Sequence, residues 1–156
     1  MTDTYRPLAT VTLGSAASSV TFSSIPATYR DLIVVIEGTT ATNFNLTTQV
    51  NSDTGNNYST VEANGSSSGT QSFANTSLDR FYAASMQTAR TNVTYQFMDY
   101  SATDKHKTVL VRNGVGGDRT SMVAGRWAST AAITSIFFYG GTFAAGSNFS
   151  LYGIAS

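Results

Sequence analysis

The feature that most constrains this fold is the C-terminal stretch Arg126–Ser156, thirty-one residues that contain two apolar runs rich in β-forming residues. The runs are Ile133–Tyr139 and Phe149–Ile154, and the segment between them is rich in Gly, Ser and Asn. Glycine reaches positive φ at no steric cost, and Ser and Asn side chains hydrogen-bond their own backbone in turns, so this segment predicts a reversal of the chain. Every second residue of the last run faces the same side of a sheet. We therefore expect the C-terminus to be tied into a sheet.

Eight further segments have the alternation, or the β-branched and aromatic content, that is typical of strands. They are Tyr5–Leu13, Val20–Phe22, Asp31–Glu37, Asn45–Asn51, Leu78–Met86, Asn92–Met98, Lys107–Arg112 and Thr120–Trp127. Because Pro7 cannot donate to a β-ladder, the first of them is expected at a sheet edge. The third, DLIVVIE, is apolar almost throughout and predicts a central strand buried on both faces. A helix competes only over Leu78–Thr88.

The succession of short strands and turn signals predicts an all-β fold. We expect an antiparallel two-sheet β-sandwich of jelly-roll type with about eight to ten strands, because the chain length and strand number suit that architecture. The length of 156 residues corresponds to a single domain, residues 1–156. Residues 61–75 consist largely of Gly, Ser, Thr, Asn and Gln, offer little to bury, and predict an exposed polar loop.

Charged residues make up only 12% of the chain, nine basic against nine acidic, so the formal net charge is zero. A general binder of nucleic acid or of an anionic membrane needs an excess of Lys and Arg, so neither partner is expected. The chain has no cysteine, which excludes disulfides and thiolate metal sites. The start MTDTYRPLAT lacks the features of a signal peptide, and the longest apolar run, Leu32–Ile36, is too short to cross a bilayer.

Residues suited to catalysis are few. The single histidine, His106, stands in a charged turn, and no G-x-S-x-G motif is present, so a Ser-His-Asp site is not expected. One histidine also serves zinc poorly. Glu37 and Glu62 are the only glutamates and could form a glycosidase pair, but each stands alone in its segment. We therefore predict that the protein is not an enzyme and has no catalytic, cofactor-binding or metal-binding residues.

Two turn-rich motifs allow a binding interpretation. Asn51–Asn57, NSDTGNN, resembles part of a calcium-binding loop, but it lacks a glycine at the sixth position and flanking helices, so a hairpin turn is favoured. The glycine cluster Gly114–Gly117 could hold a phosphate only at the start of a helix. The strand-forming residues that follow favour a connection between strands instead.

Two sets of side chains could serve recognition. The aromatic residues Trp127, Tyr139, Phe149 and Tyr152 could form a platform for a sugar, although the interior of a sandwich is the favoured interpretation. Arginine outnumbers lysine by seven to two, and arginine is enriched at protein interfaces. An assembly surface and ordinary surface charge are both open for Arg80, Arg90, Arg112, Arg119 and Arg126.

Three stretches of the sequence resemble small virion proteins of tailed bacteriophages. They are Leu13–Leu32 (LGSAASSVTFSSIPATYRDL), Trp127–Ile136 (WASTAAITSI) and Phe149–Ile154 (FSLYGI), and the turn Asn51–Ser59 also fits. The last two resemble the closing hairpin of that group. Related proteins serve as capsid decoration (cement) proteins and as tips of tail or head fibres, and the shared motif carries no catalytic residue.

The resemblance implies a structural role on the outer surface of a phage particle, for a protein made in the host cytoplasm. The chain lacks the heptads of a fibre stalk, which favours a decoration protein that bridges neighbouring major capsid subunits. We expect a homotrimer, because repeated symmetric contacts make even weak interfaces sufficient. The alternative is a fibre-tip domain that binds a host receptor or surface glycan.

Overall fold

The computed structural model describes residues 4–116 and 119–155, and over these ranges the chain forms twelve strands and no helix. The strands are β1 (Tyr5–Thr12), β2 (Ala17–Phe22), β3 (Asp31–Gly38), β4 (Phe44–Val50), β5 (Tyr58–Ser66), β6 (Gly69–Leu78), β7 (Phe81–Met86), β8 (Thr91–Met98), β9 (Lys107–Val115), β10 (Arg119–Trp127), β11 (Ile136–Phe143) and β12 (Asn148–Ile154). The all-β class is confirmed, and the strand number exceeds the expected eight to ten. In the described part of the chain, no helix is long and apolar enough to cross a membrane.

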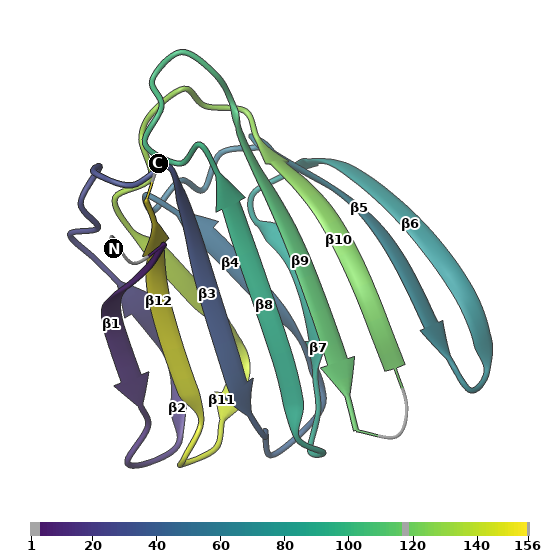
Figure 1. Cartoon of the computed structure of the whole chain (residues 1–156). Helices are drawn as coiled ribbons and strands as arrows, with labels where there is room; N and C mark the ends of the chain where they lie inside the picture. Colours follow the sequence, from purple (N-terminus) through teal and green to yellow (C-terminus); the bar gives the residue numbers. More distant parts are fainter. Residues whose placement is uncertain (1–3, 117–118, 156) are drawn as a thin grey trace.

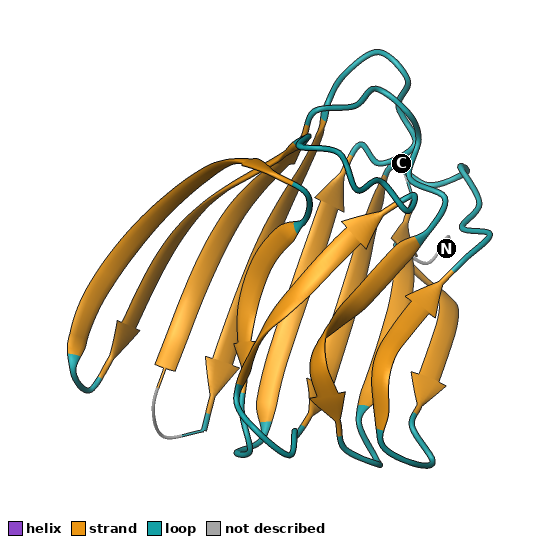
Figure 2. Ribbon diagram, turned by 180° about the vertical axis from the view of Figure 1, so that it is seen from behind, coloured by secondary structure: helices purple, strands orange, loops and turns teal. Residues whose placement is uncertain are grey.

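The strands form two antiparallel sheets that face each other. The large sheet has eight strands in the order β1-β12-β3-β8-β9-β10-β5-β6, and the small sheet has four in the order β2-β11-β4-β7 (Figure 1). The chain changes sheets at most connections. Seen from behind, the β5–β6 hairpin extends past the small sheet (Figure 2). The two-sheet, antiparallel arrangement was expected from the sequence. Pro7 lies in β1, which is an edge strand as predicted.

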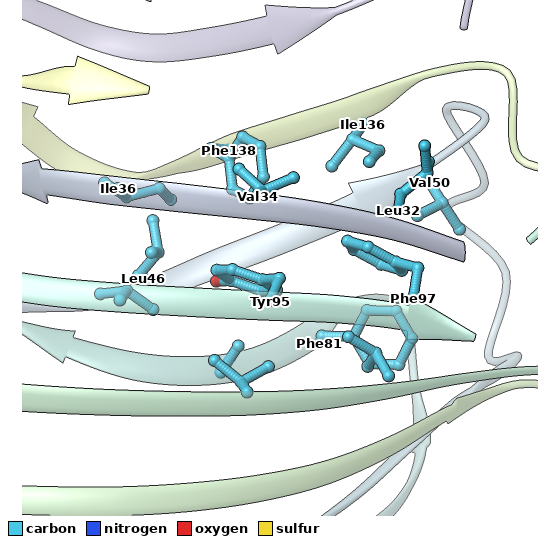
Figure 3. Packing of buried hydrophobic residues seen from close by; sticks show 14 of the residues in the cluster. Leu32, Val34, Ile36, Leu46, Val50, Phe81, Tyr95, Phe97, Ile136 and Phe138 are labelled. Atoms are coloured by element: carbon cyan, nitrogen blue, oxygen red, sulfur yellow. The ribbon is translucent and has the colours of Figure 1, made fainter. Parts of the chain in front are cut away.

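The hydrophobic core lies between the two sheets, because each inner strand turns its apolar residues to the same side. In the large sheet these include Leu32, Val34 and Ile36 of β3, each with no exposed surface. Figure 3 shows them against residues of the small sheet such as Leu46 and Phe138. Full burial of side chains of this size stabilises the fold by about 1.5–3 kcal/mol each. The region around β3 and Phe138 therefore holds the two sheets together.

The C-terminal reversal exists, but it does not close a hairpin. β11 belongs to the small sheet and β12 to the large sheet, so the segment after Phe143 crosses from one sheet to the other. β11 begins at Ile136 rather than at Ile133, which is buried in the preceding connection and donates its N–H to the carbonyl of Tyr100 at 2.9 Å. β12 pairs with β1 and β3, which confirms that the C-terminus is held in a sheet.

The interpretation of Asp31–Glu37 as a strand buried on both faces is only half correct. β3 is a central strand, but Val35 is 37% exposed and Glu37 is exposed, because no layer covers the other face of the large sheet. We call this uncovered side the outer face. The predicted strand Leu78–Met86 is also divided, since Leu78 ends β6 and Phe81 begins β7.

The prediction of an exposed loop over residues 61–75 is wrong in conformation and right in exposure. The segment forms most of the β5–β6 hairpin, with β5 paired to β10 and β6 paired to β5. Nine of the ten residues of β6 are exposed, so neither face of that strand requires apolar side chains. Because the apolar alternation that identifies a half-buried strand is absent there, the sequence pattern resembles a loop.

Candidate functional site

One depression lies where the large sheet extends past the small one. β7 is the edge strand of the small sheet, whereas β10, β5 and β6 continue the large sheet beyond it. A groove of about 390 Å³ lies between them. We call it the groove and define it by six of its lining residues: Glu62, Asn64, Gln71, Phe73, Tyr82 and Arg119.

Buried polar residues lie beside the groove, where Asn113, Ser121 and Asn64 are successive cross-strand neighbours in the large sheet. Asn113 of β9 donates from Nδ2 to the carbonyl of Ser85 at 3.1 Å and accepts a hydrogen bond from the hydroxyl of Ser121. Asn64 donates from Nδ2 to Oε1 of Glu62 at 3.0 Å. Asn64, Asn113 and Ser121 are all buried. Because buried polar groups need partners, this network fixes the side chains below the groove.

The walls of the groove carry aromatic rings and one unsatisfied donor. Phe73 on β6 is 48% exposed and Tyr82 on β7 is 41% exposed. Arg119 lines the same groove, and its buried Nε atom has no hydrogen-bond partner within the described part of the chain. Amide, carboxylate and guanidinium groups beside exposed rings can hydrogen-bond and stack on a neutral polar ligand.

A second, more open depression of about 710 Å³ lies on the outside of the small sheet. Phe137 and Tyr139 stack there with ring centroids 4.7 Å apart, and the guanidinium of Arg80 lies 5.4 Å from the Tyr139 ring. Burial raises the pKa of Tyr139, and Arg80 partly opposes that shift. Arg80 is also paired with Asp79, which raises the pKa of the guanidinium. The two stacked rings and the arginine form an aromatic surface on the outside of the small sheet.

The glycines of β11 shape this second depression. Gly140 has a φ of 133°, and a Cβ there would lie 2.5 Å from the carbonyl oxygen of Asn45. A Cβ on Gly141 would lie 2.3 Å from the ring of Phe44. The strand register also shifts between Tyr139 and Phe143. Glycine is therefore required where β11 comes this close to β4, its neighbour in the small sheet.

The candidate catalytic residues do not come together. His106 is exposed in the connection between β8 and β9. Glu62 lines the groove, whereas Glu37 is exposed and forms an ion pair with Arg90. Three strands separate β3 from β5 in the large sheet, which places the two glutamates about 19 Å apart at the usual strand spacing. Within residues 4–116 and 119–155, no three His, Cys, Asp or Glu residues cluster in a way that could hold a metal ion.

The Asn51–Asn57 segment is not the hairpin turn that the sequence favoured. It connects β4 of the small sheet to β5 of the large sheet. The Asp53 carboxylate accepts hydrogen bonds from the Gly55 N–H at 2.8 Å, Asn57 Nδ2 at 2.9 Å and Trp127 Nε1 at 2.6 Å. Burial opposes ionisation, but these donors outweigh it and lower the pKa of Asp53. The carboxylate therefore anchors the connection to β10.

The four aromatic residues considered for a sugar platform do not come together. Trp127 and Phe149 belong to the core, as favoured, while Tyr139 lies on the outside of the small sheet and Tyr152 is half-buried in β12 of the large sheet. The five arginines are dispersed as well: Arg119 lines the groove, Arg80 and Arg90 are paired with acids, and Arg112 and Arg126 are exposed on the large sheet.

In the glycine cluster for which a connection between strands was favoured over a phosphate site, Gly114 lies within β9 and Gly116 follows it, while Gly117 lies outside the described residues.

The groove was missed in the sequence because its wall was interpreted as a loop. A signal was present: Glu62 and Asn64 alternate on β5, and Gln71, Phe73 and Asn75 alternate on β6, all toward the groove. Lys107 was also missed as a buried residue. It is 1% exposed and donates from Nζ to the carbonyls of Lys105 and Thr130 at 2.8 and 3.1 Å.

Comparisons with known proteins place the chain in no family. No protein-family model matches it, and no curated protein matches it. Among solved structures, a protein of unknown function from Shewanella oneidensis MR-1 is similar with a TM-score of 0.26 and 10% sequence identity, over 97% of this chain and 76% of that one. A similarity at this level carries no argument about function.

Proposed function

We propose that the protein is a structural component of a tailed-phage particle, a decoration protein that binds across neighbouring subunits of the shell. The sequence resemblance motivates this proposal. The observation that carries it is an uncharged, largely apolar row of side chains that crosses the large sheet on its outer face. The successive cross-strand partners are Pro7, Tyr152, Ile33, Gln96, Leu110, Ala124, Val61 and Ala74.

This row suits a protein contact for two reasons. Gln96 is its only strongly polar side chain besides the Tyr152 hydroxyl, and it contains no charged residue. Its exposure increases from Ile33, which is buried, toward the β5–β6 hairpin, where Val61 is 57% exposed, and Met122 on the same side of the sheet is 52% exposed. Contiguous exposed apolar surface on a folded domain marks an interaction site more often than isolated apolar residues do.

The proposal includes a jelly-roll architecture for eight of the twelve strands. Without β5, β6, β9 and β10, the sheets reduce to β1-β12-β3-β8 and β2-β11-β4-β7. Along those eight strands the chain changes sheets at every step except from β4 to β7, which are neighbours in the small sheet, as in two interleaved Greek keys. The β5–β6 and β9–β10 pairs are then two hairpins added to one sheet. Viral capsid domains and lectins both use this fold, so the fold alone does not decide the function.

The first test is the number of copies in purified particles. A decoration protein is expected in hundreds of copies, whereas about a dozen or fewer would support a fibre tip.

The outer face can be tested on particles stripped of the protein, since Val61→Lys places a charge in the apolar row. We expect this variant to bind at least about tenfold more weakly than Ser15→Lys, a control in the exposed β1–β2 turn. Equal binding by both variants would overturn the assignment of this face.

The groove supports a second candidate function, a fibre-tip domain that binds a surface glycan. Side-chain amides of Asn64 and Gln71 lie beside the rings of Phe73 and Tyr82. Amides hydrogen-bond hydroxyl groups without requiring a charged ligand, and aromatic rings pack against the apolar faces of sugars. The orphaned Nε of Arg119 supplies a further donor.

A glycan array probed with the purified chain tests this candidate, followed by calorimetry on any saccharide that binds. Tyr82→Ala and Glu62→Gln are expected to weaken binding by about tenfold or more, because each removes a group that faces the groove. Tyr152→Ala, which changes a tyrosine away from the groove, should bind as the wild type does. The absence of saccharide binding on the array would exclude this function.

A further inference from the structure

The two edges of the large sheet differ in how they are protected. β1, at one edge, contains Arg6 and Pro7, and its register shifts between Pro7 and Ala9. β6, at the other edge (Figure 1), contains no charge and no proline, its register with β5 shifts only beyond Asn75, and nine of its ten residues are exposed. An unprotected edge strand presents a row of free backbone donors and acceptors to another strand. The partner is not specified by exposure alone.

The sequence of β6 indicates which partner fits. Thr70 to Thr76 reads TQSFANT, and the order of chemical types is the same from either end about Phe73. Threonine occupies both ends, an amide follows on each side (Gln71 and Asn75), and a small residue lies on each side of the ring (Ser72 and Ala74). A strand with this symmetry is complementary to an antiparallel copy of itself.

We propose that two copies of this chain associate through β6, antiparallel and centred on Phe73, about a twofold axis perpendicular to the sheet. Such an axis keeps the two faces of the sheet distinct, so Phe73 meets Phe73 of the second copy on the groove side. In this register Gln71 lies opposite Asn75, and Thr70 lies opposite Thr76. Aromatic pairs, threonine pairs and amide pairs are the cross-strand contacts that stabilise sheets.

Because β6 carries no charge, it has nothing to attract a charged foreign strand, and this favours pairing with a second copy of itself. Since the strand is neutral, no like charges oppose each other across the axis. The contact joins two large sheets into one continuous sheet and places the two grooves side by side, because Phe73 lines the groove. The inference does not depend on the proposed role in a virion. This twofold contact would give a dimer, whereas the homotrimer expected from the sequence needs a threefold contact. The molar masses of the two assemblies differ.

The pairing is tested first by molar mass in solution, measured by light scattering after size-exclusion chromatography. The wild type is expected to be a dimer, and Phe73→Lys and Phe73→Glu should each be monomeric, with dimer dissociation constants raised by more than about tenfold. An equimolar mixture of the two variants should recover the dimer, because opposite charges then meet at the axis. Tyr5→Lys, which changes an exposed ring at the opposite edge, is the matched control and should remain dimeric. Circular dichroism separates loss of pairing from loss of folding.

Cysteine cross-linking tests the register independently. The chain has no cysteine, so an introduced thiol is unique. Phe73→Cys should form a disulfide-linked dimer under mild oxidation, since directly opposed residues lie about 4.5–5.5 Å apart between Cα atoms. Gln71→Cys should not, because its copies would be offset by four residues, about 14 Å. A monomeric wild type, a trimer unaffected by Phe73→Lys, or equal cross-linking at both positions would overturn the proposal.

Discussion

Replacing Phe138 with alanine is expected to lower the free energy of unfolding by about 3–5 kcal/mol, the usual cost of truncating a buried aromatic side chain. Phe138 has no exposed surface and lies between the two sheets. Its ring centroid is 6.3 Å from Phe22, 5.3 Å from Tyr95 and 6.0 Å from Phe149, and the last two belong to the large sheet. The cavity would therefore weaken contacts within the small sheet and between the sheets.

A loss of this size is comparable to the total stability of many domains, which is about 5–15 kcal/mol. Urea unfolding followed by tryptophan fluorescence measures it, because Trp127 is the single tryptophan and is buried. Phe137→Ala is the matched control, since the neighbouring ring is half-buried on the outside of the small sheet and stacks on Tyr139. The control should lose about 0.5–1.5 kcal/mol. Equal losses for the two variants would contradict the assignment of Phe138 to the core.

Alternation within a strand could be predicted from the sequence because it depends on neighbours along the chain. The run Ile136–Tyr139 shows this: Ile136 and Phe138 are buried, and Phe137 and Tyr139 are not. Which sheet a strand joins depends on contacts between distant segments. β11 and β12 are adjacent in sequence, yet they pair with β2 and β4 in one sheet and with β1 and β3 in the other. For this reason the sequence predicted a closing hairpin at a point where the chain instead crosses from one sheet to the other.

The groove could not be predicted for a related reason. Apart from Asn64, which is buried, its polar residues in β5 and β6 are exposed or half-buried, and such residues follow no apolar period. The strand that pairs with β5 on its other side, β10, lies more than forty residues further along the chain. Asn113 and Ser121 were likewise indistinguishable from surface residues, although both are buried below the groove. A polar site inside a β fold is defined by long-range pairing, so the residue types alone do not identify it.

Alkaline pH should unfold the protein, because burial raises the pKa of three tyrosines in the core, in addition to that of Tyr139 on the outside of the small sheet. Tyr58 and Tyr95 have almost no exposed surface, and Tyr100 has none. Burial is the main cause of the raised pKa in each, and hydrogen bonds, such as the one between Thr48 Oγ1 and the Tyr95 hydroxyl at 3.0 Å, only partly oppose it. The pKa of Lys107 is shifted in the opposite direction, since burial lowers it.

In the unfolded chain a tyrosine loses its proton near pH 10, whereas the folded protein retains it to higher pH. The stabilisation from the protonated ring is therefore fully present below about pH 10 and is lost as the pH rises toward the folded-state pKa. Each tyrosine lowers the free energy of unfolding by up to about 1.4 kcal/mol per pH unit in that window. Lys107 has the opposite slope below about pH 10.5, but it is one group against three.

Urea unfolding at several pH values between about 9 and 12 measures the slope, and tyrosinate absorbance measures the ionisation itself. Tyr95→Phe should reduce the slope by about 1.4 kcal/mol per pH unit, since one proton no longer differs between the two states. Tyr5→Phe, at a ring that is 57% exposed, is the matched control. If stability stays constant through this range, or if Tyr95→Phe leaves the slope unchanged, the buried tyrosines do not hold their protons as this packing requires.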